Sequence, residues 1–381
     1  MNGQTRGHWN EDDGMKKFNS TPLTNEQKRI GLRPHVAVRL MLTLLLLCAH
    51  LSWAGAPPAE HFAVTGFSPD SKKLYLEYAD TTGKVRIGWM NLATRKVSLF
   101  EPQNTQDQLA AASSSSDGKQ LAIVIKEAAH NFESSQIGIL DLKSNTYRAI
   151  THGYAYRQFP SFSRDGKKII FASPNHIRKN GHTRFSGWDI YEVDVNTGVE
   201  RALTKYCFFA VTYPFYLGGG DKFIFSGESP NCNYPSPDSP AAFDAYSNKY
   251  HENEIFVRDV GKDEPLEPLF QYGKLSDYPF VTRDGEIFFR SSDGYNYDIF
   301  TYSKGVIRQL TNLKTYLWSY VVSPRGDLIE YGSDKKRNHH VKQWLMDVKS
   351  SKRSKRSEID FGDSKSFQII KVIDQFKGEI K

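Results

Sequence analysis

The chain of 381 residues is long enough for two or three domains, and it carries a formal net charge of +7. Residues 1–56 hold seven Lys and Arg against four Asp and Glu, and residues 349–356 hold five more cations. Without both segments 38 cationic side chains face 39 anionic ones, which excludes the basic face that nucleic-acid binding needs. The aromatic residues, 13% of the chain, favour strands, and no long helix is evident.

The amino-terminal segment predicts export. After a polar, patternless start, Arg39 precedes the apolar run 42–48, and small residues follow as far as Ala54 and Ala56. A cation, a short apolar run and small residues make a secretory signal peptide, with cleavage near Ala54–Ala56. The apolar run is too short for a comfortable membrane span. We therefore expect residues 1–56 to be a leader and the mature chain to be periplasmic or secreted. The alternative is an uncleaved amino-terminal anchor, which would be the chain's contact with the membrane.

From residue 57 onward, one short phrase occurs six times. Clear copies begin at Phe67 (FSPDSKKLYLEY), Ser114 (SSSDGKQLAIVI) and Ser161 (SFSRDGKKIIFAS), and blurred copies begin at Phe215, Phe280 and Val321. In the pattern S-x-D-G-K, the Asp side chain caps a turn and Gly supplies the positive φ that a tight hairpin requires. An apolar run precedes this turn and an alternating run follows it, so the phrase predicts two antiparallel strands.

Four of the copies are followed by a second phrase, for example DIYEVDVNTGVERALT at 189–204. Apolar and polar residues alternate in it, and Asn196-Thr197-Gly198 turns the chain into a second hairpin. Four strands in each of six repeats predict an all-β fold, a six-bladed β-propeller of four-stranded antiparallel blades over residues 57–381. The blades are expected to start near residues 60, 108, 158, 211, 277 and 318. A β-sandwich would not repeat this two-hairpin phrasing, and the coils of a β-solenoid are shorter.

The repeats resemble those of a known family. Ser68-Pro69-Asp70, the Ser-Arg-Asp-Gly run 163–166, Asp189-Ile190-Tyr191 and the Leu-Thr pairs at 203–204 and 310–311 are similar to the repeat of TolB-type, WD-like propellers. The resemblance extends from about Ala59 to the end. TolB has a separate amino-terminal domain for which this chain has no room, so the resemblance is to the propeller part alone. It implies a scaffold of the cell envelope that binds a partner protein.

Aligned repeats place aromatic residues at equivalent positions. Six residues before the turn Asp the repeats carry Val64, Ala111, Phe159, Tyr213, Tyr278 and Ser319, and Pro follows each of the three aromatic residues. Proline is tolerated at the first residue of a strand, where it fixes the direction of the chain. The aromatic–Pro pairs either pack the rim of the propeller or line a cleft. We take Phe159, Tyr213 and Tyr278 as candidate binding residues for a peptide, a protein segment or a sugar.

Two long loops are expected on the same face, at 174–187 and at about 228–252. Long loops in a compact repeat fold are usually functional or disordered. His176, His182 and Arg184 of the first loop are further candidate binding residues. Export leaves Cys207 and Cys232, which we place at one rim, where a disulfide is plausible. The alternative is two free thiols that lie too far apart to bridge.

Seven histidines are expected in loops of this face: His130, His152, His176, His182, His251, His339 and His340. Converging imidazoles could bind a transition metal, and some propeller-shaped polysaccharide lyases use such a site. However, polar residues collect in loops generally, and the spacing matches no local ligand motif. The run 291–298 also lacks the spacing of a calcium loop. We therefore predict no metal and no cofactor.

Catalytic motifs are absent from the sequence. It contains no G-x-S-x-G elbow, no phosphate-binding glycine loop and no cysteine pair with metal-ligand spacing. We expect a non-enzymatic exported propeller that binds an envelope protein or peptide through its loop-rich face. The alternatives are a metal-dependent enzyme similar to polysaccharide lyases and a passive carbohydrate-binding propeller. For the carboxyl-terminal segment 366–381 both a helix and a strand remain open.

Overall fold

The computed structural model describes residues 60–102, 106–128, 133–179, 183–230, 253–262, 265–272, 275–292, 296–334, 341–350, 357–361 and 364–375. These residues belong to one compact unit, Pro57–Lys381. The expected leader, residues 1–56, and its cleavage site near Ala54–Ala56 lie outside the described residues. No helix in the described part of the chain is long and apolar enough to span a membrane.

Each sequence repeat forms an antiparallel meander. The first three meanders comprise β1 (His61–Phe67), β2 (Lys73–Ala79), β3 (Val85–Asn91) and β4 (Val97–Pro102); β5 (Gln108–Ser114), β6 (Gln120–Lys126), β7 (Ser135–Asp141) and β8 (Thr146–Ala149); and β9 (Gln158–Phe162), β10 (Lys168–Lys179), β11 (Thr183–Asp194) and β12 (Glu200–Ala202). The last three comprise β13 (Phe208–Leu217), β14 (Lys222–Pro230) and β15 (Asn253–Asp259); β16 (Leu275–Val281), β17 (Ile287–Ser292), β18 (Tyr297–Ser303) and β19 (Val306–Gln309); and β20 (Tyr316–Val322), β21 (Leu328–Asp334), β22 (Lys342–Asp347) and β23 (Ser357–Glu358). The 3₁₀ turn η2 (Ser364–Ser366) and strand β24 (Gln368–Asp374) follow.

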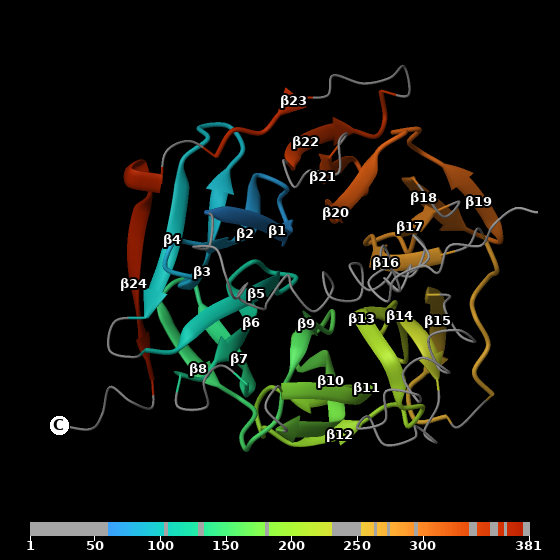
Figure 1. Ribbon diagram of the computed structural model, residues 1–381, viewed down its shortest axis with the longest axis horizontal. Helices are drawn as coiled ribbons and strands as arrows, with labels where there is room; N and C mark the ends of the chain where they lie inside the picture. Colours follow the sequence, from blue (N-terminus) through green and yellow to red (C-terminus); the bar gives the residue numbers. More distant parts are fainter. Residues whose placement is uncertain are drawn as a thin grey trace, which may run out of the picture. The chain divides into compact units, whose positions relative to one another are not determined.

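The meanders stand around a common centre, with β1, β5, β9, β13, β16 and β20 innermost (Figure 1), which is the arrangement of a β-propeller. The expectation of six separate four-stranded sheets is wrong, because the described strands are hydrogen-bonded in four sheets. β24 pairs in parallel with β4 and β8 and joins the first two meanders into nine strands. β11 meets β13 at Trp188 and Phe208 and joins the next two into seven. Between β15 and β16 the described residues contribute an isolated bridge, Phe256–Pro268, in place of a fourth strand.

The first phrase of the repeat forms the turn that its residues predict. Ser68 Oγ donates to Asp70 Oδ1 at 2.6 Å, and the amide of Lys73 donates back to Ser68 Oγ at 2.9 Å. Gly118 and Gly166 in later copies have φ values of 72° and 71°, a region that favours glycine. The prediction of a capped hairpin turn with a positive-φ glycine is therefore confirmed.

The second phrase has a structural role as well. Thr204 Oγ1 donates to Asp189 Oδ1 at 2.6 Å, and the amide of Tyr206 donates to the same oxygen at 2.8 Å. Thr311 and Asp298 repeat the contact at 2.8 Å. Each Asp therefore fixes the chain where it leaves one meander for the next, and the D-I and L-T elements of the repeat belong to the scaffold.

The hydrophobic core lies between neighbouring sheets. Tyr75 and Ile87 of the first meander, for example, are buried in one cluster with Leu121 and Ile123 of the second. The second strand of a meander, such as β2, β6, β17 or β21, is almost entirely buried. A charged side chain on such a strand therefore needs a partner or must give up its charge.

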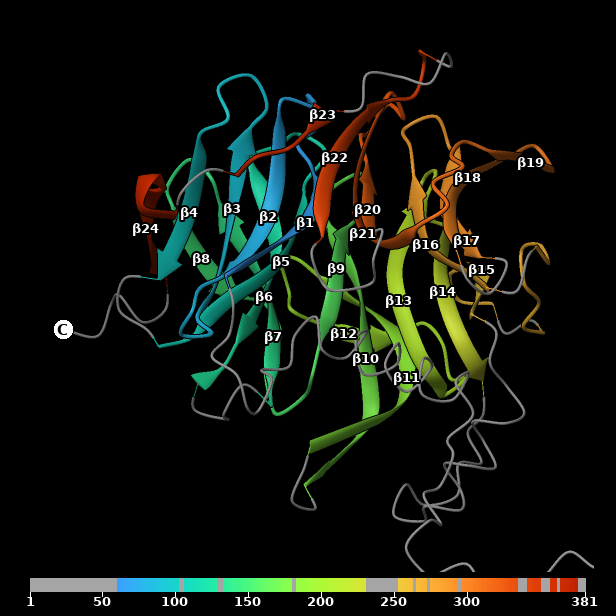
Figure 2. The ribbon, with the colours of Figure 1, turned by 45° about the horizontal axis from the view of Figure 1, so that its top comes forward.

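The carboxyl-terminal segment forms the strand β24, and the residues before β24 pack in the hydrophobic cluster between the last and first meanders. Before β24, Phe361 stacks on Phe62 with ring centroids 4.4 Å apart, and Phe367 meets the edge of the same ring at 5.7 Å. β24 then lies at the outer edge beside β4 (Figure 2), where Lys371 Nζ lies 2.6 Å from Glu101 Oε2. The segment links elements that are nearly 300 positions apart in sequence.

Candidate functional site

An aromatic row crosses three successive inner strands. Phe159 of β9, Tyr213 of β13 and Tyr278 of β16 are each half-buried. The ring centroids of Phe159 and Tyr213 are 4.8 Å apart, and those of Tyr213 and Tyr278 are 4.5 Å apart. The structure thus brings together the three aromatic residues that the repeat alignment selected. We call these three residues the aromatic row.

A β-bulge holds each member of the row. Tyr213 and Pro214 together oppose one residue of β14, and the pairs that begin with Phe159 and Tyr278 interrupt the register of β9 and β16 in the same way. A bulge tolerates the missing N–H of proline and re-aims the preceding side chain. The expectation that the proline stands at the first residue of a strand is wrong, because the pairs lie inside their strands.

The backbone at the row is strained. Phe159, Tyr213 and Tyr278 have φ values of 54°, 49° and 54°. A bulky residue in this left-handed region costs roughly 1–3 kcal/mol, and such strain is enriched at binding sites. Ala111 has φ 35° in the equivalent bulge of β5, so this conformation also occurs where the side chain is not aromatic. What distinguishes the three meanders of the row is therefore the aromatic side chains that the bulges present.

A buried ion pair supports one end of the row. Arg290 of β17 donates to both carboxylate oxygens of Asp277, at 2.7 and 2.6 Å, and its guanidinium lies 4.2 Å from the ring centroid of Tyr278. Its Nη1 donates to the carbonyl oxygens of Leu317 and Trp318 at the bulge of the next inner strand. Burial opposes the charge, but the Asp277 carboxylate outweighs it and holds the pKa of Arg290 above its ordinary value. Tyr278 is therefore held on a fixed, charged support.

Neither Asp277 nor Arg290 is among the candidate site residues that the sequence predicts. A signal was available, because Arg290 interrupts the apolar run of β17 immediately after Phe288 and Phe289. Glu77 occupies a comparable place on β2, and there Ala111 N donates to Glu77 Oε2 at 2.8 Å. In both cases a buried charge on a second strand reaches the bulge of the following meander.

The two tyrosines of the row keep their hydroxyl groups available. Among the described residues neither the Tyr213 nor the Tyr278 hydroxyl has a hydrogen-bond partner. Burial raises the pKa of both phenols above the ordinary value, so both remain protonated and can donate. The row therefore offers an apolar surface with two free donors.

The predicted loop 174–187 is largely a hairpin, so that expectation is wrong. β10 runs to Lys179 and β11 starts at Thr183, and the two strands project beyond their neighbours (Figure 2). The missed signal was the Asn-Gly pair within this loop, a strong hairpin indicator. His176 and Arg184 lie in the two strands, but their side chains, and residue His182 as a whole, lie outside the described part. Their role in binding stays a prediction.

The remaining predicted sites are described only in part. Cys207 is disulfide-bonded. Cys232 lies outside the described residues, so the pairing of Cys207 with Cys232 stays a prediction. The described residues hold no group of three or more His, Cys, Asp or Glu that could bind a metal ion. Of the seven histidines expected in loops, those whose side chains are not described are His130, His176, His182, His251, His339 and His340.

The fold and the row define a β-propeller with an aromatic site among its inner strands. No family model matches the chain, and no curated protein matches it. Among solved structures the chain is similar to TolB from Acinetobacter baumannii, with 19% identity and a TM-score of 0.49 over 79% of this chain and 66% of that one. The resemblance to TolB propellers expected from the repeats therefore recurs among the solved structures.

Two enzymes share the fold as well. An oligogalacturonate lyase in complex with manganese is 14% identical, with a TM-score of 0.50 over 76% of this chain and 74% of that one. A puromycin-hydrolysing peptidase from Mycobacterium tuberculosis is 8% identical, with a TM-score of 0.53 over 79% of this chain and 52% of that one. At these identities the likeness shows the fold alone, and the chain spans about half of the peptidase.

Proposed function

We propose that the chain is an exported, non-enzymatic β-propeller that binds an extended segment of a partner protein over the aromatic row. The observation that carries the proposal is the ring-to-ring contact of Phe159, Tyr213 and Tyr278 across three inner strands. Aromatic residues are enriched in the energetic centres of protein interfaces, and half-buried rings with free hydroxyls combine apolar area with hydrogen bonding. The proposed export follows from the leader 1–56, and the proposed place of action is the cell envelope.

The dimensions of the row suit an extended chain. Neighbouring ring centroids along the row are 4.8 Å (Phe159 to Tyr213) and 4.5 Å (Tyr213 to Tyr278) apart. At about 3.3 Å per residue, an extended peptide would place about three residues over it. The two phenol donors, one in the middle of the row and one at its end, can bond peptide carbonyl oxygens, while the rings take apolar side chains. A folded globular surface would need a wider platform than three rings provide.

The row is also held in place before binding. The bulges fix the backbone, and Arg290 holds Tyr278 through a cation–π contact and the ion pair with Asp277. A partner that binds such a site orders few side chains, so little of its interaction energy is lost to conformational entropy. Preorganisation of this kind is what a permanent binding surface requires.

A metal-dependent, sugar-cleaving enzyme is the second candidate. The observation that favours it is the shared fold of an oligogalacturonate lyase in complex with manganese. It would require the histidines whose side chains lie outside the described part. Metal analysis of the purified full chain, before and after incubation with manganese, separates the two candidates. Stoichiometric manganese would favour the enzyme, and its absence would favour the scaffold.

Site-specific photo-crosslinking tests the proposed function. A photoreactive phenylalanine analogue replaces Phe159, Tyr213 or Tyr278 in turn, and the chain is expressed in the cells that naturally contain it. Matched controls carry the analogue at Tyr191 or Tyr302, which are half-buried on the third strands β11 and β18. We expect one adduct of the same mass from all three row positions and from neither control. Adducts that form equally at the controls, or at none of the five positions, would overturn the proposal.

A further inference from the structure

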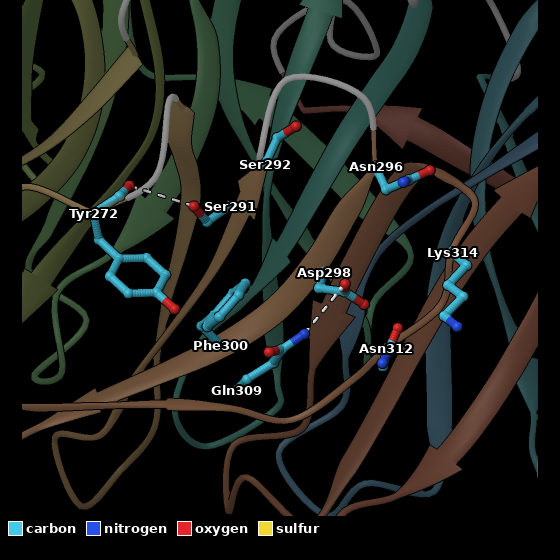
Figure 3. A pocket seen from close by; sticks show the side chains of 9 residues that line it. All are labelled: Tyr272, Ser291, Ser292, Asn296, Asp298, Phe300, Gln309, Asn312 and Lys314. Atoms are coloured by element: carbon cyan, nitrogen blue, oxygen red, sulfur yellow. Dashed lines mark hydrogen bonds between the residues drawn. The ribbon is translucent and has the colours of Figure 1, made fainter.

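A pocket of about 560 Å³ opens beside the sheet β16–β19 (Figure 3). It takes its lining from the segment before β16, from the facing ends of β17 and β18, and from the chain at and after the end of β19: Tyr272, Ser291, Ser292, Asn296, Asp298, Phe300, Gln309, Asn312 and Lys314. No residue of the aromatic row is among them. The volume is within the range of roughly 300–1,000 Å³ in which small-molecule sites fall. The pocket is thus a site separate from the proposed peptide surface.

One wall of the pocket is aromatic. The Tyr272 side chain meets the ring of Phe300 edge-on, with centroids 5.1 Å apart, and Tyr272 is 40% exposed. Its carbonyl oxygen accepts hydrogen bonds from Ser276 Oγ at 2.8 Å and Ser291 Oγ at 3.4 Å. The segment that carries the ring is therefore tied to β16 and β17. A partly exposed and anchored ring is suited to contact with the apolar face of a ligand.

The carboxylate in the pocket is already used by the fold. Asp298 Oδ1 accepts hydrogen bonds from Thr311 Oγ1 at 2.8 Å and from the amide of Leu313 at 2.7 Å. Asp298 Oδ2 accepts one from Gln309 Nε2 at 3.3 Å (Figure 3). These contacts close the chain after β19, so Asp298 is a scaffold residue here and is not free to receive a cation.

Three other polar groups face the hollow without partners in the described part of the chain. They are the Tyr272 hydroxyl, the Asn312 carboxamide and the Lys314 ammonium. Figure 3 shows Tyr272 on one side of the hollow and Asn312 and Lys314 on the other. Lys314 has φ 49°, a conformation in which glycine or asparagine would be less strained, so its backbone is held at some cost. A lysine without a carboxylate partner is a ready counter-charge for an anion.

We propose that this pocket binds a small, hydroxylated ring compound that carries one carboxylate. The exposed Tyr272 ring takes the apolar face of the ligand's ring. The Asn312 amide and the Tyr272 hydroxyl hydrogen-bond its hydroxyl groups, and Lys314 pairs with its carboxylate. This inference does not rest on the proposed peptide binding, because the two sites share no residue.

Calorimetric titration of the full chain tests the inference with three probes. D-glucuronate carries the ring, the hydroxyls and the carboxylate; D-glucose lacks the carboxylate; acetate lacks the ring. We expect saturable binding of glucuronate, binding of glucose about tenfold weaker because a charge-assisted hydrogen bond is lost, and no measurable binding of acetate. Lack of saturable glucuronate binding, or equal affinity for glucuronate and acetate, would overturn the inference.

Matched variants assign any binding to the pocket. Lys314→Met should remove the preference for glucuronate over glucose, whereas Lys304→Met, at another exposed lysine with the same φ of 49°, should leave it unchanged. Tyr272→Ala should weaken both sugars, and Tyr154→Ala, at a tyrosine of equal 40% exposure, should not. Glucuronate affinity that survives both Lys314→Met and Tyr272→Ala would contradict the assignment. The double variant Tyr213→Ala/Tyr278→Ala should bind glucuronate normally, which keeps this test separate from that of the peptide surface.

Discussion

Arg290 holds Asp277 through two hydrogen bonds, from Nε to Oδ1 at 2.7 Å and from Nη2 to Oδ2 at 2.6 Å, and their side chains are only 3% and 4% exposed. The same guanidinium stacks on Tyr278 at one end of the aromatic row. A charge pair buried this deeply must remain intact, because either partner alone would be an uncompensated charge in an apolar interior. The pair therefore connects the buried scaffold to Tyr278 of the proposed binding surface.

Removing one partner of this pair should be strongly destabilising. Asp277→Asn or Arg290→Met should each lower the free energy of unfolding by about 3–5 kcal/mol, as measured by urea denaturation. The double variant Asp277→Leu/Arg290→Met should lose less unfolding free energy than either single variant, since it leaves no unpaired charge. A double variant that loses the sum of both single effects would show that the pair acts through packing and not through charge compensation.

Glu330 should make the free energy of unfolding fall as the pH rises. Its side chain is fully buried, and in the described part of the chain neither carboxylate oxygen has a hydrogen-bond partner. Burial raises the pKa of Glu330 well above its ordinary value, so the folded chain retains a proton that the unfolded chain releases above about pH 4.3. The free energy of unfolding is therefore highest, as far as Glu330 is concerned, below about pH 4.3. It falls as the pH rises toward the pKa of Glu330 in the folded chain.

The variant Glu330→Gln should remove this titration. The difference in unfolding free energy between the variant and the parent should shift in favour of the variant by more than about 1 kcal/mol from pH 5 to pH 8. Taking the difference cancels the titration of Lys126, whose pKa burial lowers.

Glu192→Gln is the control of opposite sign. Burial opposes ionisation of Glu192, but hydrogen bonds from Tyr216, Arg201 and Lys168 outweigh it and lower its pKa. Glu192→Gln should therefore be less stable than the parent at neutral pH, and the gap should close under acid conditions. A pH-independent difference for Glu330→Gln would contradict the account.

The carboxyl-terminal segment should stabilise the fold mainly through apolar packing. Phe361→Ala removes a buried ring that stacks on Phe62, and we expect a loss of about 3 kcal/mol. Lys371→Met removes a salt bridge at a lysine that is 56% exposed, and it should cost less than about 1 kcal/mol. Urea denaturation of both variants measures the contrast. Equal effects would show that packing at the seam between the last and first meanders is not what the segment supplies.

Cys207 should stabilise the fold through its disulfide. If the partner is Cys232, mass spectrometry of a non-reducing digest will contain one peptide that links the two residues. Cys232→Ser should then lower the unfolding free energy by roughly 2–4 kcal/mol, and reduction should have no further effect on that variant. A free Cys232 thiol in the oxidised parent chain would contradict this pairing.

Local features of the fold could be predicted from the sequence because their causes are local. The turn at Ser68–Asp70 needs only a serine, an aspartate and a chain reversal, so each copy could be recognised by itself. The pairing of β24 with β4 could not, because it joins Lys371 to Glu101 across most of the chain and no short pattern encodes it. For the same reason the merging of meanders into four sheets was missed.

The candidate site was predictable in its side chains and not in its geometry. Alignment of the repeats selected Phe159, Tyr213 and Tyr278, because equivalent positions of a repeat occupy equivalent places around a ring. The bulges were missed because proline was assigned to a strand end. Arg290 was missed because its partner Asp277 lies on a different strand, and a single charge in an apolar run does not reveal which residue neutralises it.

The most direct test of the central claim is the affinity of the purified crosslinking partner for three forms of the chain. These are the parent, the row variant Tyr213→Ala/Tyr278→Ala and the control Tyr191→Ala/Tyr302→Ala, each first shown to be folded by its cooperative unfolding. Because buried aromatic anchors contribute about 2 kcal/mol or more each, we expect the row variant to bind at least about a hundredfold more weakly and the control to bind as the parent does. Undiminished affinity in a folded row variant would contradict the proposed binding surface.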